Sequence, residues 1–321
     1  MENERIAVVF PGQGSQVEGM GKDFFEQIDE TRMVYEEASD ALGWSVADMC
    51  FNGDHRLHLT EFTQPCILTT EIAVLRGLFT RYGFAPSIYG GHSLGEFTAL
   101  VSAGVLPLFA AVKIVQSRGR VMQGACPVGF GGMAAVIIEG LDIDKLNEVI
   151  RDLPLDIANI NSSRQVVISG ASDRLPEAES RIKKAFSDKK KLFVVPLKVS
   201  APFHSRFMSA AEKAFEEILL ENSRHFIPQK AITVTSNYTG NFHTGSSEDL
   251  FRSLTFQLGH AVRWKDNMEA LARAAGEIYE VGPARNLGGD FKTVNVNCRS
   301  VVSLAAADEI FSNKVFQLKE V

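Results

Sequence analysis

The sequence has few cysteines, and their spacing suggests neither a metal site nor a disulfide framework. Its four cysteines, Cys50, Cys66, Cys126 and Cys298, are far apart in a chain of 321 residues, whereas metal sites and small disulfide-rich proteins place cysteines at short intervals. The first residues also lack the pattern of a secretory signal. We therefore expect reduced thiols, a cytoplasmic location and no metal site, and none of the four cysteines is expected to be catalytic.

The chain also lacks long apolar runs and an excess of positive charge. Its longest apolar runs fall well short of the roughly 20 residues that cross a bilayer, so we expect no membrane association. The formal net charge is −6, which excludes a general affinity for nucleic acid. An anionic substrate would therefore have to be bound by individual basic residues, which makes single arginines informative.

The remaining composition is ordinary, and the order of predicted elements indicates an α/β fold with a parallel sheet. With 45% hydrophobic and 22% charged residues, the chain suits a soluble protein with one large domain or one large and one small. The run IAVVF at 6–10 is typical of a buried parallel strand. The elements predicted next are helices within 21–50, 63–82, 95–103 and 108–122 and a short strand at 87–90. The helix at 63–82 is expected to carry one broad apolar face formed by Ile67, Leu68, Ile72, Leu75, Leu78 and Phe79.

A second unit is predicted in the middle of the chain. Proline and three glycines in ACPVGFGG at 125–132 end the helical pattern, and the elements predicted over 133–197 have the order β-α-β-β-α-β, which is the ferredoxin-like unit. Further helices and a strand-like run at 232–235 follow. We expect a discontinuous large domain, residues 1–130 and 198–321, with a small subdomain, residues 131–197, inserted into it.

The motif Gly91-His92-Ser93-Leu94-Gly95 is typical of a nucleophile elbow. Glycines two residues to either side of the serine permit a tight strand-to-helix turn, which exposes the hydroxyl of Ser93. The helix that follows directs free N–H groups toward an oxyanion forming beside the serine, with Leu94 N–H as the natural first donor. The alternative is a Gly-rich turn with a solvent-exposed serine.

A nucleophilic serine needs a base, for which the histidines are candidates. His204 lies in VSAPFHS at 199–205, where the chain leaves the small unit and re-enters the large one, and such hinges often border a cleft. His92 is an alternative, although a tight turn would direct it elsewhere. Four others lie in polar or charged loops and are expected to be solvated: His55, His58, His225 and His243.

Five segments occur in the order and at the spacing of the malonyl-CoA:acyl carrier protein transacylases, which the chain resembles over nearly its whole length. They are FPGQGSQ at 10–16, GHSLGE at 91–96, SRG at 117–119, APFHS at 201–205 and QLGHAVRW at 257–264. The resemblance implies an α/β-hydrolase-like large domain with an inserted ferredoxin-like subdomain. It also implies transfer of malonyl from malonyl-CoA, through a seryl ester, to the phosphopantetheine thiol of an acyl carrier protein in fatty acid or polyketide synthesis, without a metal or redox cofactor.

The family's catalytic pair falls on Ser93 and His204, and its oxyanion hole falls on the backbone N–H groups of Leu94 and Gln13. The backbone carbonyl of Gln257 would orient the histidine.

Two further residues would select the substrate. Arg118 matches the arginine that pairs with the malonyl carboxylate, and a planar guanidinium fits a carboxylate better than a lysine does. Arg120, by contrast, is expected on a helix surface. Phe203 would crowd the space that an α-methyl branch of the substrate needs.

Some positions depart from the family pattern and leave two other functions open. Phe130, His260-Ala261 and the segment 282–286 differ from the common residues, which affects pocket shape and acceptor preference. An acyl-thioester hydrolase would use the same Ser93 and His204 with water as acceptor, although Arg118 argues against it, because a neutral acyl chain leaves a buried guanidinium unpaired. A non-enzymatic docking module on the same fold is the second alternative.

Overall fold

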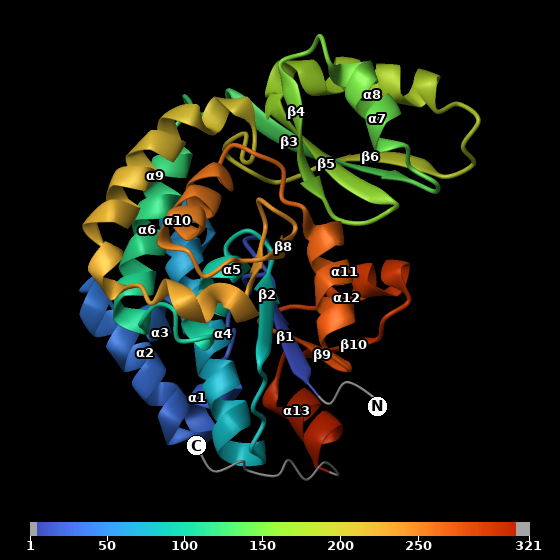
Figure 1. Cartoon of the computed structure of the whole chain (residues 1–321). Coiled ribbons are helices and arrows are strands. Elements are labelled where there is room, and N and C mark those ends of the chain that lie inside the picture. Colours follow the sequence, from blue (N-terminus) through green and yellow to red (C-terminus); the bar gives the residue numbers. More distant parts are fainter. Residues whose placement is uncertain (1–4, 313–321) are drawn as a thin grey trace.

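A four-stranded parallel sheet lies at the centre of the larger part of the molecule (Figure 1). The computed structural model describes residues 5–312. The strands lie in the order β10-β9-β1-β2 and pair in parallel throughout. Their bounds are β1 (Ile6–Phe10), β2 (Ile88–Gly91), β9 (Glu277–Val281) and β10 (Cys298–Val301).

Strand β1 is apolar at every position because both faces of the sheet are covered. Val8 and Phe10 belong to the core formed with the N-terminal helices, whereas Ala7 and Val9 belong to the core on the opposite face. The helices of this larger part are α1 (Lys22–Gln27), α2 (Asp29–Leu42), α3 (Val46–Phe51), α4 (Thr60–Tyr82), α5 (Gly95–Ser102), α6 (Leu108–Gly124), α9 (Ser209–Glu221), α10 (Ser247–Phe256), α11 (Trp264–Ala274), α12 (Gly288–Phe291) and α13 (Leu304–Phe311).

Residues 131–196 form a second, antiparallel sheet with its own core, at the top of Figure 1. Its strand order, β4-β5-β3-β6, together with the chain order β-α-β-β-α-β, is that of the ferredoxin-like unit. The elements are β3 (Gly131–Ile138), α7 (Ile143–Ile150), β4 (Leu155–Ile160), β5 (Gln165–Ala171), α8 (Leu175–Ala185) and β6 (Leu192–Pro196). The α/β fold and this inserted element order are confirmed, while the domain boundaries stay a prediction that the separate core supports.

Two local predictions are wrong. The run 232–235 is mostly a 3-10 helix, Pro228–Thr233, and only Thr235 enters a strand, the short β7 (Thr235–Ser236), which pairs with β8 (Asn241–Phe242). Helix α4 was expected to carry one broad apolar face that included Phe79. Instead its middle is buried on nearly every side, Glu71 included, because α2, α5 and α6 pack around it, while Phe79 is 45% exposed near its end.

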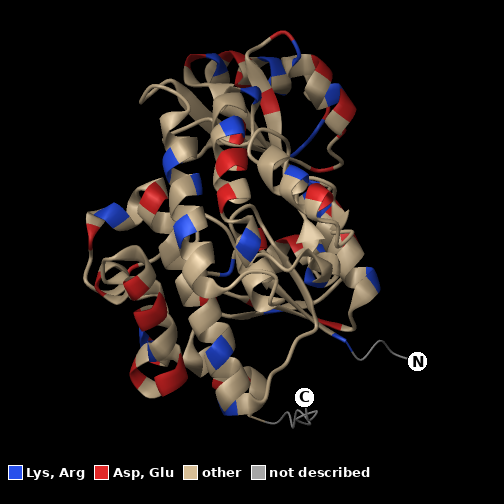
Figure 2. Ribbon diagram, turned by 60° about the vertical axis from the view of Figure 1, so that its left-hand side comes forward, with Lys and Arg blue, Asp and Glu red and all other residues tan. Residues whose placement is uncertain are grey.

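Most charged residues lie on the outside of this arrangement. Figure 2 shows Lys and Arg interspersed with Asp and Glu along the outer helices. Strands β1 and β2 carry no charged residue. No helix in the described part of the chain is long and apolar enough to cross a membrane.

Candidate active site

Ser93 lies on a tight turn between β2 and α5, and its backbone has a φ of 51°, in the left-handed region. The turn requires glycine on both sides. A Cβ on Gly91 would lie 2.1 Å from the Gly95 carbonyl carbon, and a Cβ on Gly95 would lie 2.1 Å from the Phe10 carbonyl oxygen. The elbow predicted from the motif is therefore present, and its glycines are required by close backbone contacts.

The turn places Ser93 beside His204, which comes from the loop after the small unit. Ser93 Oγ lies 2.9 Å from His204 Nε2, and His204 Nδ1 lies 2.7 Å from the backbone oxygen of Gln257. Because a carbonyl can only accept, Nδ1 carries the ring proton, and Nε2 is left to accept the hydrogen bond from the serine hydroxyl.

The surroundings of His204 favour its neutral form. The side chain is buried, and burial together with the nearby positive charge of Arg118 lowers the pKa of His204 to about 3. Both causes disfavour a charged imidazole. The imidazole of His204 is therefore unprotonated at neutral pH.

Arg118, on α6, reaches the hydroxyl of Ser93 from the other side. Its Nη2 donates to Ser93 Oγ at 3.2 Å and to Gln257 Oε1 at 2.5 Å, and its Nη1 donates to Gln64 Oε1 at 3.0 Å. The side chain is 1% exposed, and burial lowers its pKa to about 10, so it stays charged at neutral pH. Within residues 5–312, Nε has no hydrogen-bond partner and no carboxylate pairs with the guanidinium.

The Gly-rich loop after β1 packs directly against the elbow. A Cβ on Gly12 would lie 2.4 Å from the His92 carbonyl oxygen, so the two backbones touch at that position. Because β1 and β2 are parallel neighbours, both loops lie at the same edge of the sheet. Across residues 5–312, neither Gln13 N–H nor Leu94 N–H donates to another group of the protein.

A cavity of about 200 Å³ lies between the two sheets and has Ser93 in its wall. The larger part contributes Gln13 and Arg118, and the small sheet contributes Met133 and Val167. The remaining lining residues are Gln64, His92, Met122, Asn159, Asn161, Leu197, Val199, Phe203 and His204. Sequence-predicted residues from four separate segments thus meet around one space.

The similarity to known proteins spans the segments that form this site. The sequence profile of the acyl transferase domain matches residues 7–274. The malonyl CoA-acyl carrier protein transacylase of Bacillus subtilis is 36% identical over 324 residues, covering 98% of each chain. The chain belongs to the malonyl-CoA:acyl carrier protein transacylase family.

Other members of this transacylase family agree in structure and extend to polyketide synthesis. The crystal structure of the Clostridium perfringens transacylase superposes with a TM-score of 0.87 at 33% identity and covers 96% of each chain. A malonyl-transacylase solved in complex with a holo type II polyketide acyl carrier protein has a TM-score of 0.85 at 32% identity, covering 97% of this chain and 100% of that one. The polyketide transacylase PksC of Bacillus subtilis is 34% identical over 289 residues, 88% of this chain and 95% of that one.

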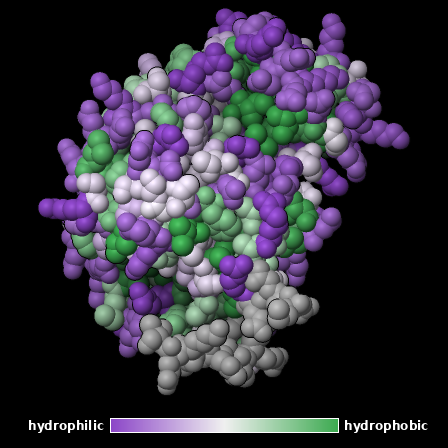
Figure 3. All heavy atoms as spheres, in the orientation of Figure 1, coloured by the Kyte–Doolittle hydropathy of each residue, from purple (hydrophilic) through white to green (hydrophobic). Residues whose placement is uncertain are grey.

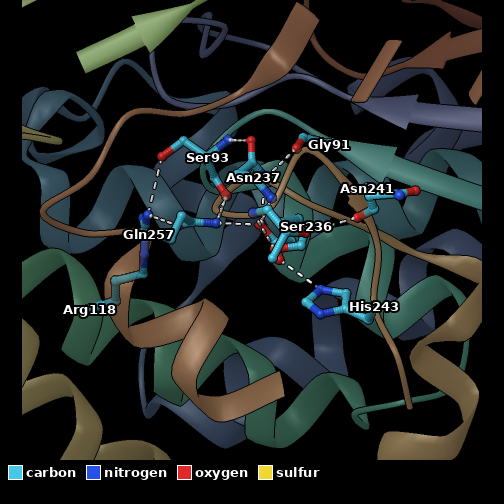
Figure 4. Close-up of polar contacts among 10 residues, drawn as sticks. Gly91, Ser93, Arg118, Ser236, Asn237, Asn241, His243 and Gln257 are labelled. Carbon is cyan, nitrogen blue, oxygen red and sulfur yellow. Dashed lines mark hydrogen bonds and ion pairs between the residues drawn. The ribbon is translucent and has the colours of Figure 1, made fainter. Parts of the chain in front are cut away.

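A buried polar network, of which only Ser93, Arg118 and Gln257 were predicted as site residues, supports the site in this transacylase (Figure 4). Glu96 is fully buried, and its Oε2 accepts from Asn237 N at 2.9 Å and from Gln257 Nε2 at 2.6 Å. Asn237 Oδ1 in turn accepts from Ser93 N at 3.2 Å, and its Nδ2 donates to Gly91 O at 2.8 Å. Glu96 is thus one amide away from Arg118, and Asn237 holds the strained turn in place.

The histidine expectations need one correction. His243 was expected to be solvated, but it is 6% exposed, and its Nε2 lies 2.9 Å from Glu96 Oε1, because its loop folds back over the elbow. The ring of His92 lies against the small sheet, where Nε2 is 2.9 Å from Asn161 Oδ1, and the geometry gives it no contact with Ser93 Oγ. His204 is therefore the histidine placed to act on the serine.

The residues of the network differ in how visible they are in the sequence. Glu96 stands inside the GHSLGE motif, so its place next to the elbow was a usable signal. Gln64 and Asn237 carry no comparable signal, because each is far in sequence from its partner and no motif surrounds it. Of the residues that depart from the family pattern, His260 lies outside the set formed by Ser93, His204 and Arg118. Its side chain is 52% exposed and pairs with Glu212.

Proposed function

We propose that this chain transfers malonyl from malonyl-CoA to the phosphopantetheine thiol of an acyl carrier protein through an ester on Ser93. One observation carries the proposal: the Arg118 guanidinium is buried, lies 3.2 Å from the nucleophilic oxygen and pairs with no carboxylate of residues 5–312. A substrate with a free carboxylate would supply the missing negative charge. The planar guanidinium of an arginine can donate two parallel hydrogen bonds to the two oxygens of a carboxylate. The relatives are named for this reaction.

In the acylation step, His204 Nε2 takes the proton of Ser93 Oγ while Oγ attacks the thioester carbonyl carbon. The resulting oxyanion is stabilised by the N–H groups of Leu94 and Gln13. Collapse of the intermediate breaks the C–S bond, and the imidazolium returns its proton to the departing CoA sulfur. The products are malonyl-Ser93 and CoA.

In the transfer step the same groups work in reverse order. The carrier thiol gives its proton to His204 Nε2 and attacks the seryl ester, and the C–O bond breaks as the proton returns to Ser93 Oγ. Gln257 O keeps the histidine in the required tautomer through its 2.7 Å hydrogen bond. Only protons and an acyl group move, so the step needs no redox cofactor, and the residues named here account for each proton and each bond.

Selectivity would come from two residues of the cavity wall. Arg118 would bind the malonyl carboxylate. Glu96 would act as a buried negative charge near Arg118 that accepts no hydrogen bond from its guanidinium. Phe203, which is 7% exposed and lines the cavity next to His204, would disfavour an α-methyl branch. Malonyl-CoA should therefore be preferred to both acetyl-CoA and methylmalonyl-CoA.

The comparisons give the hydrolase alternative no support, and they include transacylases of fatty acid and of polyketide synthesis. Either pathway fits the site, because both use the same malonyl and phosphopantetheine groups. A cytoplasmic location is part of the proposal, and four cysteines that form no disulfide support it.

Radiolabelled malonyl-CoA tests this function. We expect wild type to form a malonyl-protein adduct and, with a holo acyl carrier protein, malonyl-carrier rather than free malonate. The variant Ser93→Ala should form no adduct, as measured by intact mass. An adduct on that variant, or release of malonate as the main product of wild type, would contradict the proposal.

A further inference from the structure

Glu96 and His243 form a buried pair that takes no part in the acyl-transfer steps. Glu96 Oε1 lies 2.9 Å from His243 Nε2, and the two side chains are 0% and 1% exposed. Glu96 lies in the first turn of α5, and His243 directly follows β8. Figure 3 shows the face of the molecule over β8 and α10, where hydrophilic and hydrophobic side chains together cover this interior. A buried carboxylate is costly unless it is paired and hydrogen-bonded, so the pair calls for an explanation.

Both oxygens of Glu96 are used as hydrogen-bond acceptors. Oε1 faces His243, whereas Oε2 accepts from Asn237 N at 2.9 Å, from Asn237 Nδ2 at 2.5 Å and from Gln257 Nε2 at 2.6 Å. A backbone N–H and an amide nitrogen can only donate, so Oε2 has to accept all three bonds, which is the role of an ionised carboxylate. His243 supplies the donor for the other oxygen and so completes the set.

The charge of Glu96 reaches Arg118 across a single amide group. Gln257 directs Nε2 to Glu96 and Oε1 to Arg118 Nη2, which lies 2.5 Å away. In Figure 4, Arg118 and His243 lie at opposite ends of this network. Because Glu96 stands between the imidazole and the guanidinium, its charge acts on Arg118 from closer than any charge on His243 does. Burial lowers the pKa of Arg118, and the negative charge of Glu96 acts in the opposite direction.

A substrate carboxylate bound to Arg118 would face this same negative charge. Arg118 lines the cavity that contains Ser93, whereas neither Gln257 nor Glu96 does. The substrate and Glu96 would therefore act on the guanidinium from different sides, and neither would displace the other. Two negative charges that share one buried cation repel each other. Glu96 should therefore weaken the attraction of Arg118 for malonyl without competing for its hydrogen-bond donors.

We propose that the pair of Glu96 and His243 weakens the hold of Arg118 on the malonyl carboxylate, so that the malonyl group can leave for the carrier thiol. This inference rests on the proposed function and deepens it by adding two positioning residues that act on the substrate through Arg118. In the substrate-free protein, Glu96 offsets the buried charge of Arg118. With malonyl bound, the same charge keeps the bound state from becoming too stable to react onward. His243 occupies Oε1 of Glu96 and keeps Oε2 directed at Gln257.

Glu96→Gln separates the charge of this residue from its shape. The new amide oxygen can replace Oε2 as the acceptor for Asn237 and Gln257. The new amide nitrogen can donate to His243, since a neutral imidazole accepts at Nε2 when Nδ1 carries the proton. The variant therefore keeps the hydrogen bonds of the network and removes only the negative charge, which a purely structural role of Glu96 does not need.

Binding is measured in a protein that cannot react. Ser93→Ala prevents ester formation, and this protein, with and without Glu96→Gln, is titrated with malonyl-CoA and with acetyl-CoA by isothermal calorimetry. Glu71→Gln in the same background is the matched control, because Glu71 is also fully buried in the larger part but its Oε2 accepts from Thr98. In proteins that retain Ser93, KM for malonyl-CoA and the rate of malonyl transfer from Ser93 to the small thiol N-acetylcysteamine are measured as well.

We expect Glu96→Gln to lower Kd for malonyl-CoA by about tenfold, because one buried like charge is removed, and to leave Kd for acetyl-CoA within about twofold. With Ser93 present, the same change should lower KM for malonyl-CoA and slow malonyl transfer to N-acetylcysteamine. His243→Leu should shift these values in the same direction, since Glu96 Oε1 loses its donor, whereas His243→Gln, which keeps a donor, should stay within about twofold of wild type. All values of the Glu71→Gln control should stay within about twofold too.

Several outcomes would overturn the proposal. An unchanged or higher Kd for malonyl-CoA in Glu96→Gln would show that its charge does not oppose the substrate carboxylate. An equal shift for acetyl-CoA would show that Glu96 acts on the shape of the cavity. A His243→Leu protein that binds malonyl-CoA like wild type would refute the role of His243.

Failure of the proposed function gives a different result. A wild-type protein that forms no malonyl ester, or a Ser93→Ala protein that binds neither acyl-CoA, would refute the function and this inference with it. Normal malonyl transfer by wild type, together with equal Kd values for malonyl-CoA with and without Glu96→Gln, would refute the inference alone.

Discussion

The hydroxyl of Ser93 lies between a neutral base and a fixed cation. His204 accepts its proton, and Arg118 donates to its oxygen at 3.2 Å. The cation also acts on the base, because its charge is the second-largest cause that holds the pKa of His204 low, after burial. Two residues with separate roles in the proposed chemistry are therefore coupled electrostatically, and both the pH dependence and the selectivity should reveal this coupling.

The pH dependence of the free enzyme follows from that coupling. The acid limb of kcat/KM for malonyl-CoA should lie well below the usual histidine range near 6.5, toward the pKa of about 3 of His204. In Arg118→Ala the pKa of His204 should rise, because a nearby positive charge is removed. NMR titration of the His204 ring in both proteins measures this without relying on activity. A wild-type value near 6.5, or a downward shift in the variant, would contradict the prediction.

Selectivity for the malonyl carboxylate also depends on single residues. Arg118→Ala should reduce kcat/KM for malonyl-CoA by ~2–4 kcal/mol in transition-state terms while leaving or raising that for acetyl-CoA, since the charge partner of malonyl is gone. Arg120→Ala is the matched control, because the Arg120 side chain is 61% exposed and pairs with Glu61 on the surface. Equal losses for malonyl-CoA and acetyl-CoA in Arg118→Ala would show that Arg118 acts on structure rather than on the substrate carboxylate.

At the scale of elements, the site depends on how closely two loops approach one another. The loop after β1 and the elbow after β2 touch through backbone atoms at Gly12 and Gly95. Parallel pairing of β1 with β2 brings their carboxyl ends together, and α5 then begins directly behind the serine. The position of the proposed oxyanion donors thus follows from strand register rather than from any side chain.

Gly95→Ala tests this close approach. The new Cβ would meet the Phe10 carbonyl oxygen at 2.1 Å, so Ser93 would be displaced. We expect the free energy of unfolding to fall by ~3 kcal/mol or more, or the protein to fail to express. Gly124→Ala, at the end of α6, has nothing within 4 Å of its new Cβ, and it should be neutral or stabilising by up to ~1 kcal/mol. Urea unfolding and CoA release are the measurements, and a fully active Gly95→Ala protein would argue against the elbow's required geometry.

The whole molecule consists of two sheets with separate cores and a cavity between them. The larger part carries a buried acid in its core, since Glu71 on α4 is 0% exposed and Thr98 donates to its Oε2 at 2.6 Å. Its Oε1 has no partner in the described structure, and burial raises the pKa of Glu71 well above its usual value. At a pH between the ordinary carboxyl pKa and the raised folded value, the folded protein therefore holds a proton on this carboxyl that the unfolded chain releases.

The sign of the resulting pH dependence is fixed by that raised pKa. The contribution of Glu71 to stability is complete below the unfolded pKa near ~4.3 and is lost as the pH rises through the folded value. Glu71→Gln should therefore increase the free energy of unfolding at pH 8 by about 1–3 kcal/mol, with the gain vanishing below pH ~4. The exposed Glu30→Gln on α2 is the control, and urea unfolding across pH is the measurement. A pH-independent effect of Glu71→Gln would contradict this account.

The sequence alone determined the features that depend on local chemistry. The spacing of apolar residues and the positions of turn-forming residues identified the α/β order, the inserted β-α-β-β-α-β unit and the elbow at Ser93. This was possible because strand, helix and turn preferences act over a few residues. Five collinear motifs then indicated the family and singled out His204, Arg118, Gln13 and Gln257 as partners of the serine. Strands β9 and β10 were not predicted, and the prediction for the run 232–235 was wrong, because short apolar runs carry no decisive period.

Tertiary packing alone decided which distant groups share the buried space around Ser93. Asn237 lies 144 residues from Ser93, and Glu96 bonds to it across 141 residues. The burial of Arg118 but not Arg120, which the family resemblance led us to expect, is produced by the face of α6 that packs inward. No local preference encodes such contacts, because the cost of burying Glu96, His243 or Arg118 is offset only by partners that the completed fold supplies.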